Sequence, residues 1–152
     1  MVKSGGGCSA IKGVFDVSGK SSDREANYPI TLNGAIFHLP HTAAGAGIAV
    51  MESNPSSTSL EIQFFKSTIG NVTPLSVLKL NVDCQNGWLV VDRSGSGYAD
   101  GTYSESEGAL FFALSETGDL LVRSVFQVER KSVLIFRSSK NGDFWYSFPR
   151  AQ

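Results

Sequence analysis

A strict alternation of apolar and polar residues is the feature that most constrains what this chain can fold into. It is clearest over residues 78–84, where four apolar side chains alternate with three polar ones: Leu78, Leu80, Val82 and Cys84 against Lys79, Asn81 and Asp83. The same period recurs at 60–64 and, less regularly, at 11–17. Successive side chains of a strand point to opposite faces, so such a segment buries one face of a sheet and wets the other. The alternation therefore predicts antiparallel β structure.

Turn signals separate these segments. Asn-Gly pairs at 33–34, 86–87 and 141–142, and Thr-Gly-Asp at 117–119, lie between apolar stretches. Asn and Gly tolerate the positive φ that tight hairpins need. The C-terminal third is therefore predicted to be a β-meander, with strands at 109–114, 120–128, 132–138 and 143–148 and turns at 115–119, 129–131 and 139–142.

The remaining strands are expected near 10–17, 29–32, 35–39, 46–52, 59–66, 75–84 and 88–92. The segments 18–27, 53–58 and 93–108 are expected to be loops, with helix only as single turns there. Many short strands without an amphipathic helix favour an all-β fold, either an antiparallel β-sandwich or a closed β-barrel. We expect one domain over 10–150 after a flexible leader at 1–9.

Charge is balanced overall but uneven along the chain. The formal net charge of the 152 residues is -1, so no nucleic-acid partner is expected. Residues 92–119 hold six acidic residues and one arginine, whereas residues 120–152 hold six basic and two acidic residues. The favoured explanation is that these strands are neighbours whose solvent faces complement each other. A functional basic face is the alternative.

The two cysteines, Cys8 and Cys84, are too few for a disulfide framework or a four-cysteine zinc site. Cys84 ends the inward face of the strand at 75–84 and is expected to pack as a small apolar residue. Pairing with Cys8 remains open for a protein in an oxidising compartment.

Cys8 follows Ser4-Gly5-Gly6-Gly7 and precedes Ser9. This short pattern resembles the cleavage and acylation site of bacterial lipoproteins, although Gly5 stands where that family usually has leucine. The resemblance implies a lipid on Cys8, peripheral anchoring and a place in the cell envelope. A flexible leader or an expression remnant is the alternative. The first residues lack the apolar core of a secretory signal, and no run of 18 apolar residues predicts a transmembrane helix.

Any catalysis by histidine must use His38 or His41, the two histidines of the chain. Their spacing matches no helical zinc motif, and Pro40 places the second at a strand end. We expect both histidines to lie at a strand end. There they either contribute to a binding surface or have no functional role. No metal and no cofactor is predicted.

The segment 92–102 is rich in oxygen-bearing side chains and glycine. It has a composition similar to a calcium loop but lacks the EF-hand spacing. A long loop between strands is where binding commonly resides. Residues 93–107 are therefore the preferred binding surface, with candidate residues Asp92, Ser94, Ser96, Tyr98 and Asp100.

The aromatic segment 144–148 is predicted to be a core strand with Trp145 on its second face. A base-stacking platform is the alternative.

These observations favour a non-enzymatic binding or structural module, outside the cytoplasm, that presents 93–107 and 38–46 to a protein or glycan. The alternatives are a carrier of a small apolar ligand inside a barrel, and a hydrolase using His38 or His41.

Overall fold

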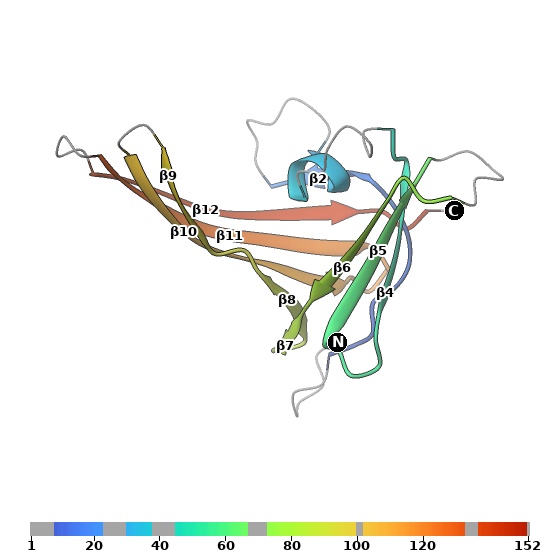
Figure 1. Cartoon of the computed structure of the whole chain (residues 1–152). Coiled ribbons are helices and arrows are strands. Elements are labelled where there is room, and N and C mark those ends of the chain that lie inside the picture. Colours follow the sequence, from blue (N-terminus) through green and yellow to red (C-terminus); the bar gives the residue numbers. More distant parts are fainter. Residues whose placement is uncertain are drawn as a thin grey trace.

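The computed structural model describes residues 8–22, 30–37, 45–66, 73–99, 102–132 and 137–151. They form two antiparallel sheets packed together as a sandwich (Figure 1). Of the two architectures left open by the sequence, the sandwich is therefore the one adopted, and no closed barrel forms among the described strands. The C-terminal meander is present, but its described residues form three long strands in place of the four predicted: β10 (Thr102–Leu114), β11 (Leu120–Ser132) and β12 (Arg137–Phe148). The strand predicted at 132–138 lies mostly outside the described residues, between β11 and β12.

The small sheet has the order β1-β4-β5-β6. Its strands are β1 (Lys12–Asp16), β4 (Ile48–Ser53), β5 (Ser59–Phe65) and β6 (Ser76–Asn81). Alternation explains β5 directly, because Leu60, Ile62 and Phe64 are fully buried while the residues between them are half-buried.

The large sheet has the order β3-β2-β12-β11-β10-β8-β7, with β9 beside one end of β10. Its strands are β2 (Ser18–Ser21), β3 (Ile30–Thr31), β7 (Asp83–Gln85), β8 (Trp88–Asp92), β9 (Gly95–Ala99), β10 (Thr102–Leu114), β11 (Leu120–Ser132) and β12 (Arg137–Phe148). A single π-helical turn, η1 (Leu32–Ile36), follows β3.

The core lies where the strands of the small sheet cross those of the large one (Figure 1). Phe37, directly after η1, joins the two layers. Its ring stacks on Phe112 of β10 at 6.0 Å and meets Phe64 of β5 edge-on at 6.4 Å. The short helical turn therefore caps one side of the sandwich.

The strand predicted at 75–84 is two strands in two sheets. β6 belongs to the small sheet and β7 to the large one, and the chain crosses between them at the buried Val82. The alternation of side chains continues through the crossing, which is why the sequence shows one uninterrupted pattern.

The segment 93–108, predicted as a loop, is mostly strand. It contributes β9 and the first half of β10, while the predicted turns at 129–131 and 139–142 lie inside β11 and β12. Polar and glycine-rich composition suggested loops there, yet these residues pair with one another along strands of 12 and 13 residues.

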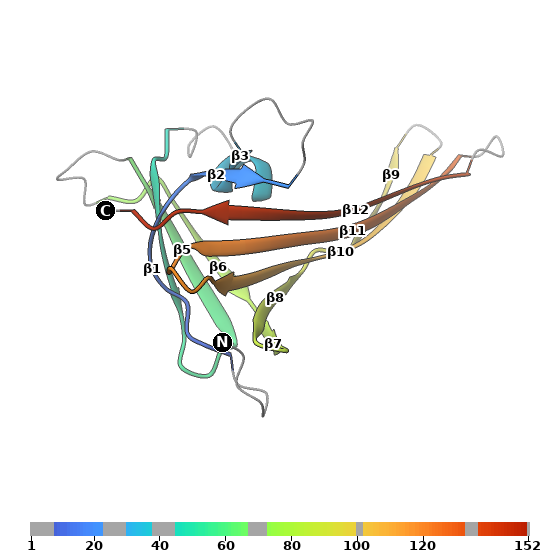
Figure 2. The ribbon, with the colours of Figure 1, turned by 180° about the vertical axis from the view of Figure 1, so that it is seen from behind.

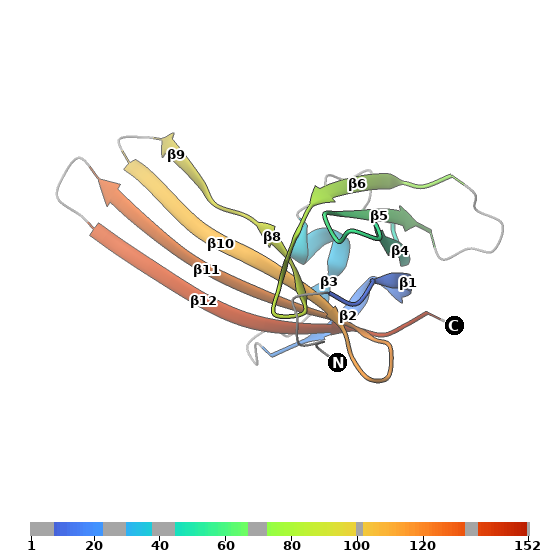
Figure 3. The ribbon, with the colours of Figure 1, turned by 90° about the horizontal axis from the view of Figure 1, so that it is seen from below.

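The far halves of these strands project beyond the small sheet as an arm (Figures 2 and 3). We define the arm as β9 together with residues 102–107, 127–132 and 137–142. At about 3.3 Å per residue, a 13-residue strand reaches about 40 Å. The last buried residues toward the arm are Leu110 and Val122.

Some of the predicted turns are present in the structure and others are not. Asn86 and Gly87 have φ of 52° and 86° and form the predicted hairpin turn between β7 and β8, and Gly118 has the positive φ of a turn, 87°. Asn33 and Gly34 instead lie in η1, where the Gly34 N–H donates to Thr31 Oγ1 at 3.2 Å. Residues 18–21, predicted as loop, form β2.

Candidate functional site

The outer face of the large sheet, turned away from the small sheet, carries the candidate site. Leu110 and Phe112 are buried against the small sheet, so Phe111 between them points outward. The register places Phe111 opposite Arg123 on β11, and Arg123 opposite Trp145 on β12. Three outward side chains from three strands therefore form one row across the sheet.

Trp88 of β8 joins this row to form a closed cluster of rings around a guanidinium group. Its indole meets Trp145 edge-on at 5.7 Å and Phe111 edge-on at 6.5 Å. The Arg123 guanidinium lies 5.2 Å from the Trp145 ring centre and 5.8 Å from that of Phe111. We call Trp88, Phe111, Arg123 and Trp145 the aromatic cluster. Trp145 remains 42% exposed, so the cluster presents an indole surface to solvent.

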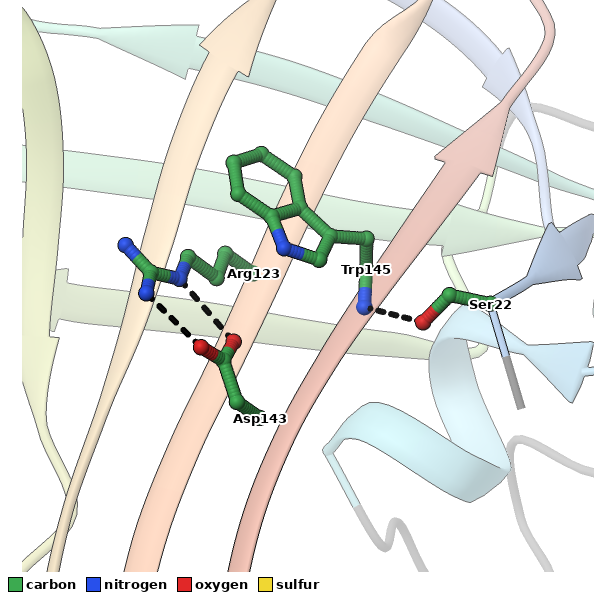
Figure 4. Close-up of polar contacts among 4 residues, drawn as sticks. All are labelled: Ser22, Arg123, Asp143 and Trp145. Carbon is green, nitrogen blue, oxygen red and sulfur yellow. Dashed lines mark hydrogen bonds and ion pairs between the residues drawn. The ribbon is translucent and has the colours of Figure 1, made fainter.

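Asp143 holds Arg123 in this position. Arg123 donates from Nε to Oδ1 at 3.0 Å and from Nη2 to Oδ2 at 2.8 Å, as Figure 4 shows. These two hydrogen bonds lower the pKa of Asp143 and raise that of Arg123. Arg123 Nη1 bonds to no other described residue, so it remains available to a ligand.

Ser22 fixes the backbone at Trp145. The Trp145 N–H donates to Ser22 Oγ at 2.9 Å (Figure 4), and the Ser22 N–H donates to the Trp145 carbonyl at 2.8 Å. These bonds continue the pairing of β2 with β12 and hold the exposed indole on a rigid strand.

An open groove of about 570 Å³ lies beside the aromatic cluster, at the base of the arm. Ala109 and Val125 form its floor in the next row along the strands, and Asp143, the third residue of that row, is bonded to Arg123. The row beyond them carries longer polar side chains, with Glu107 opposite Gln127 and Gln127 opposite Asn141. The side chains of Ala109 and Val125 are shorter than those of the rows on either side, so a groove runs across the strands at this row.

Apart from Asp143, the polar side chains of this groove are exposed and have no partner among the described residues. The Gln127 and Asn141 side chains make no hydrogen bond, and Glu107 no ion pair, with any described residue. All three are exposed. The groove therefore offers hydrogen-bond donors and acceptors next to an apolar floor.

Of the candidate residues from the sequence, Asp92 and Ser94 come together. The Ser94 N–H donates to Asp92 Oδ1 at 3.0 Å, and hydrogen bonds from the Ser94 hydroxyl and backbone lower the pKa of Asp92. Ser96 pairs opposite Glu105, and Tyr98 opposite Tyr103, both in the arm. His38, His41 and Asp100 lie outside the described residues.

The structure gives the cysteines a different role from the one favoured by the sequence. Cys8 and Cys84 form a disulfide with 5.7 Å between their Cα atoms. Cys84 is half-buried in β7 rather than an inert core thiol. A lipid on the Cys8 sulfur and this disulfide exclude one another.

The two segments of opposite charge bias are adjacent strands, as expected, because β10 pairs with β11. Their acidic and basic side chains do not face each other throughout. Glu105 stands opposite Glu129, and Arg123 pairs with Asp143 inside the basic segment. Register, which the composition does not show, decides which charges meet.

Sequence reasoning placed Trp145 on the second face of its strand, as observed, but missed Trp88, Phe111 and Arg123. Phe111 lies in a run of six apolar residues, 109–114, where both faces look alike. Only the pairing of β8, β10, β11 and β12 assembles the cluster.

Among the described residues, no helix is long and apolar enough to span a bilayer, and no group of three or more His, Cys, Asp or Glu side chains is arranged to hold a metal ion. Comparison with known proteins finds no match to this chain among protein family models, curated proteins or solved structures.

Proposed function

We propose that this protein is a non-enzymatic binding module and that the groove beside the aromatic cluster binds a glycan. The observation that carries the proposal is the exposed indole of Trp145, which belongs to the aromatic cluster whose Phe111 lines a groove with an apolar floor and exposed polar side chains.

The chemistry of this groove matches that of a sugar chain. A pyranose ring has apolar C–H faces that pack on an aromatic ring, and hydroxyl groups around its rim. Phe111 lines the groove and Trp145 adds exposed aromatic surface in the same row of side chains, while Gln127 and Asn141 offer amides that both donate and accept. Apolar contact combined with a few placed polar groups is the usual design of ligand sites.

Dimensions agree with an extended ligand. Rows of side chains on one face of a strand are about 7 Å apart, so the groove is one row wide. It extends across three strands, from β10 to β12. This shape suits a single chain of sugar rings lying across the sheet.

The acidic residues in and beside the groove indicate which kind of glycan it can bind. Glu107 lies in the groove, with Glu105 and Glu129 in the next row, and the positive charge of Arg123 is already matched by Asp143. Like charges disfavour an anionic polymer. We therefore expect neutral or amine-bearing sugars rather than uronic acids or sulfated chains.

The disulfide supports a place outside the cytoplasm, because disulfides form and persist in oxidising compartments. Peripheral attachment through Cys8 remains open only for a form of the protein in which that sulfur is free. Mass spectrometry of native material distinguishes the two forms by the mass on Cys8.

Titration calorimetry and indole fluorescence against a panel of neutral, amine-bearing and anionic oligosaccharides test the proposal. Trp145→Ala should weaken binding at least about ten-fold, because loss of an aromatic anchor commonly costs 2 kcal/mol or more. Tyr103→Ala is the matched control, since Tyr103 is a similarly exposed aromatic (40%) on the same face but two rows beyond Glu107 in β10. The proposal fails if the wild type binds no member of the panel, or if both variants retain full affinity.

A further inference from the structure

A second cavity lies on the opposite side of the same strands. It has a volume of about 350 Å³ and is lined by residues of β10, β11 and β12 together with Ile36 of η1 and Arg93. Its apolar lining includes Ile36, Leu110, Phe126 and Phe144. Both linings include residues 107–109, Val125 and Phe126, which lie in the strands between the two sites. The other lining side chains of β10 and β11 alternate to opposite faces of the sheet, so the cavity is a separate site.

The cavity forms where inward-pointing side chains of β11 and β12 are not covered by the small sheet. Phe126 and Phe144 belong to the inward set of β11 and β12 and stack at 5.9 Å, but both are only half-buried, because the small sheet ends before it covers them. Their neighbours in the same rows are small. Gly108 stands opposite Phe126, and Ser124 stands opposite both Leu110 and Phe144. Large aromatic surface beside missing side-chain volume leaves a hollow whose lining is partly apolar and partly polar.

Arg93 brings a positive charge to this hollow. Its Nη1 donates to the Ile36 carbonyl at 2.6 Å, which positions the guanidinium at the rim beside η1. Arg93 forms no ion pair with any described residue. Glu107, the one acidic residue of the lining, alternates toward the outer face and contributes backbone here.

We infer that this cavity binds a small amphipathic carboxylate, with its apolar part against Phe126, Phe144 and Ile36 and its carboxylate on the Arg93 guanidinium. An arginine fork pairs with a carboxylate through charge-assisted hydrogen bonds, and here one nitrogen is already used to hold the fork in place. Ser106 and Ser124 add hydroxyl groups to the lining.

The size of the cavity sets the size of the ligand. About 350 Å³ lies near the lower end of small-molecule pockets, which span roughly 300–1,000 Å³. A medium-chain fatty acid or a compact aromatic acid fits this range, whereas a two-chain lipid does not. The sequence-based idea of a carrier is therefore retained, with the site at the open end of a sandwich instead of inside a barrel.

The test is calorimetric titration of the intact protein with decanoate below its micelle concentration, with decanol and decyltrimethylammonium as ligands of matched chain length. Decanoate should bind more tightly than either by at least about ten-fold, because a hydrogen bond to a charged group contributes roughly 1.5–3 kcal/mol. Equal binding of the three ligands overturns the inference, as does absence of decanoate binding.

Two variants locate the site. Arg93→Gln should remove the preference for decanoate over decanol, whereas Lys131→Gln, in the arm, should leave it intact. Ser124→Leu should fill the cavity and weaken both ligands. Unchanged decanoate affinity in Arg93→Gln overturns the assignment. If Ser124→Leu does not fold, the comparison of the three ligands on the wild type still decides.

Trp145→Ala separates this inference from the proposed function. It should leave decanoate binding unchanged, because Trp145 and the cavity lie on opposite faces of the sheet. Loss of decanoate affinity in this variant would show that the two sites are one.

Discussion

At the scale of single residues, Arg123 organises the outer face. Its guanidinium contacts two aromatic rings and is held by two hydrogen bonds to Asp143. Because the pair is solvent-exposed, its contribution to global stability is small, and its main effect is on the orientation of Trp145.

The Arg123–Asp143 pair predicts a specific acid response. The pKa of Asp143 is lowered in the folded state, so its stabilising contribution is fully present above the ordinary aspartate pKa of about 4 and is lost as pH falls through the lower folded value. Urea unfolding of wild type and Asp143→Asn between pH 5 and pH 2.5 should show a shallower loss of stability in the variant. Glu105→Gln, which removes an exposed carboxylate without an ion pair, should behave like wild type. Parallel pH curves for wild type and Asp143→Asn would contradict the assignment.

At the scale of elements, the pairing of β2 with β12 joins the edge strand β3 and its neighbour β2 to the long strands of the large sheet. β2 is four residues long, yet it approaches β12 so closely that a Cβ on Gly19 would lie 2.4 Å from the Ser147 carbonyl oxygen and 2.6 Å from the Phe148 ring. Phe148 is fully buried, and a backbone oxygen in a sheet has little freedom to move. Glycine at this position is therefore a requirement of the pairing.

Gly19→Ala should lower the free energy of unfolding by about 1–3 kcal/mol, the usual cost of forcing an extra carbon into a packed region. Gly45→Ala is the matched control, since its nearest contact would be the end of the Lys66 side chain at 3.9 Å. Chemical denaturation measures both. Equal stability of the two variants would show that β2 shifts freely along β12.

At the scale of the whole molecule, the disulfide links the segment before the small sheet to an edge strand of the large sheet. Cys8 precedes β1 of the small sheet, and Cys84 lies in β7 at the edge of the large sheet, 76 residues later. A cross-link of this span removes much of the entropy of the unfolded chain. It therefore secures the two layers against separation.

Replacing both cysteines with serine should lower the free energy of unfolding by about 2–4 kcal/mol, the usual effect of a native disulfide. Guanidinium denaturation with and without a thiol reductant measures this, and the double-serine variant should not respond to the reductant. Alkylation of the oxidised protein should modify neither cysteine. A reactive Cys84 in native material would contradict the pairing.

The alternation along the chain predicted the strands and their buried faces because a strand's period of two is a local property of the backbone. It identified the inward set of β5 and the outward position of Trp145. The sequence-based prediction was wrong where a residue composition typical of turns occurs inside a paired strand. Asn141-Gly142 reads as a turn, yet the Phe126 ring lies over Gly142 in the middle of β12.

What the sequence determined by itself is the class of structure: extended segments with one apolar face, broken by turns that need positive φ. What only the tertiary structure decided is which strands are neighbours, how far they run and in what register. Those are long-range choices, made by the packing of side chains that lie far apart in the chain. The aromatic cluster, both cavities and the disulfide depend on those choices, so the candidate sites became visible only in the folded molecule.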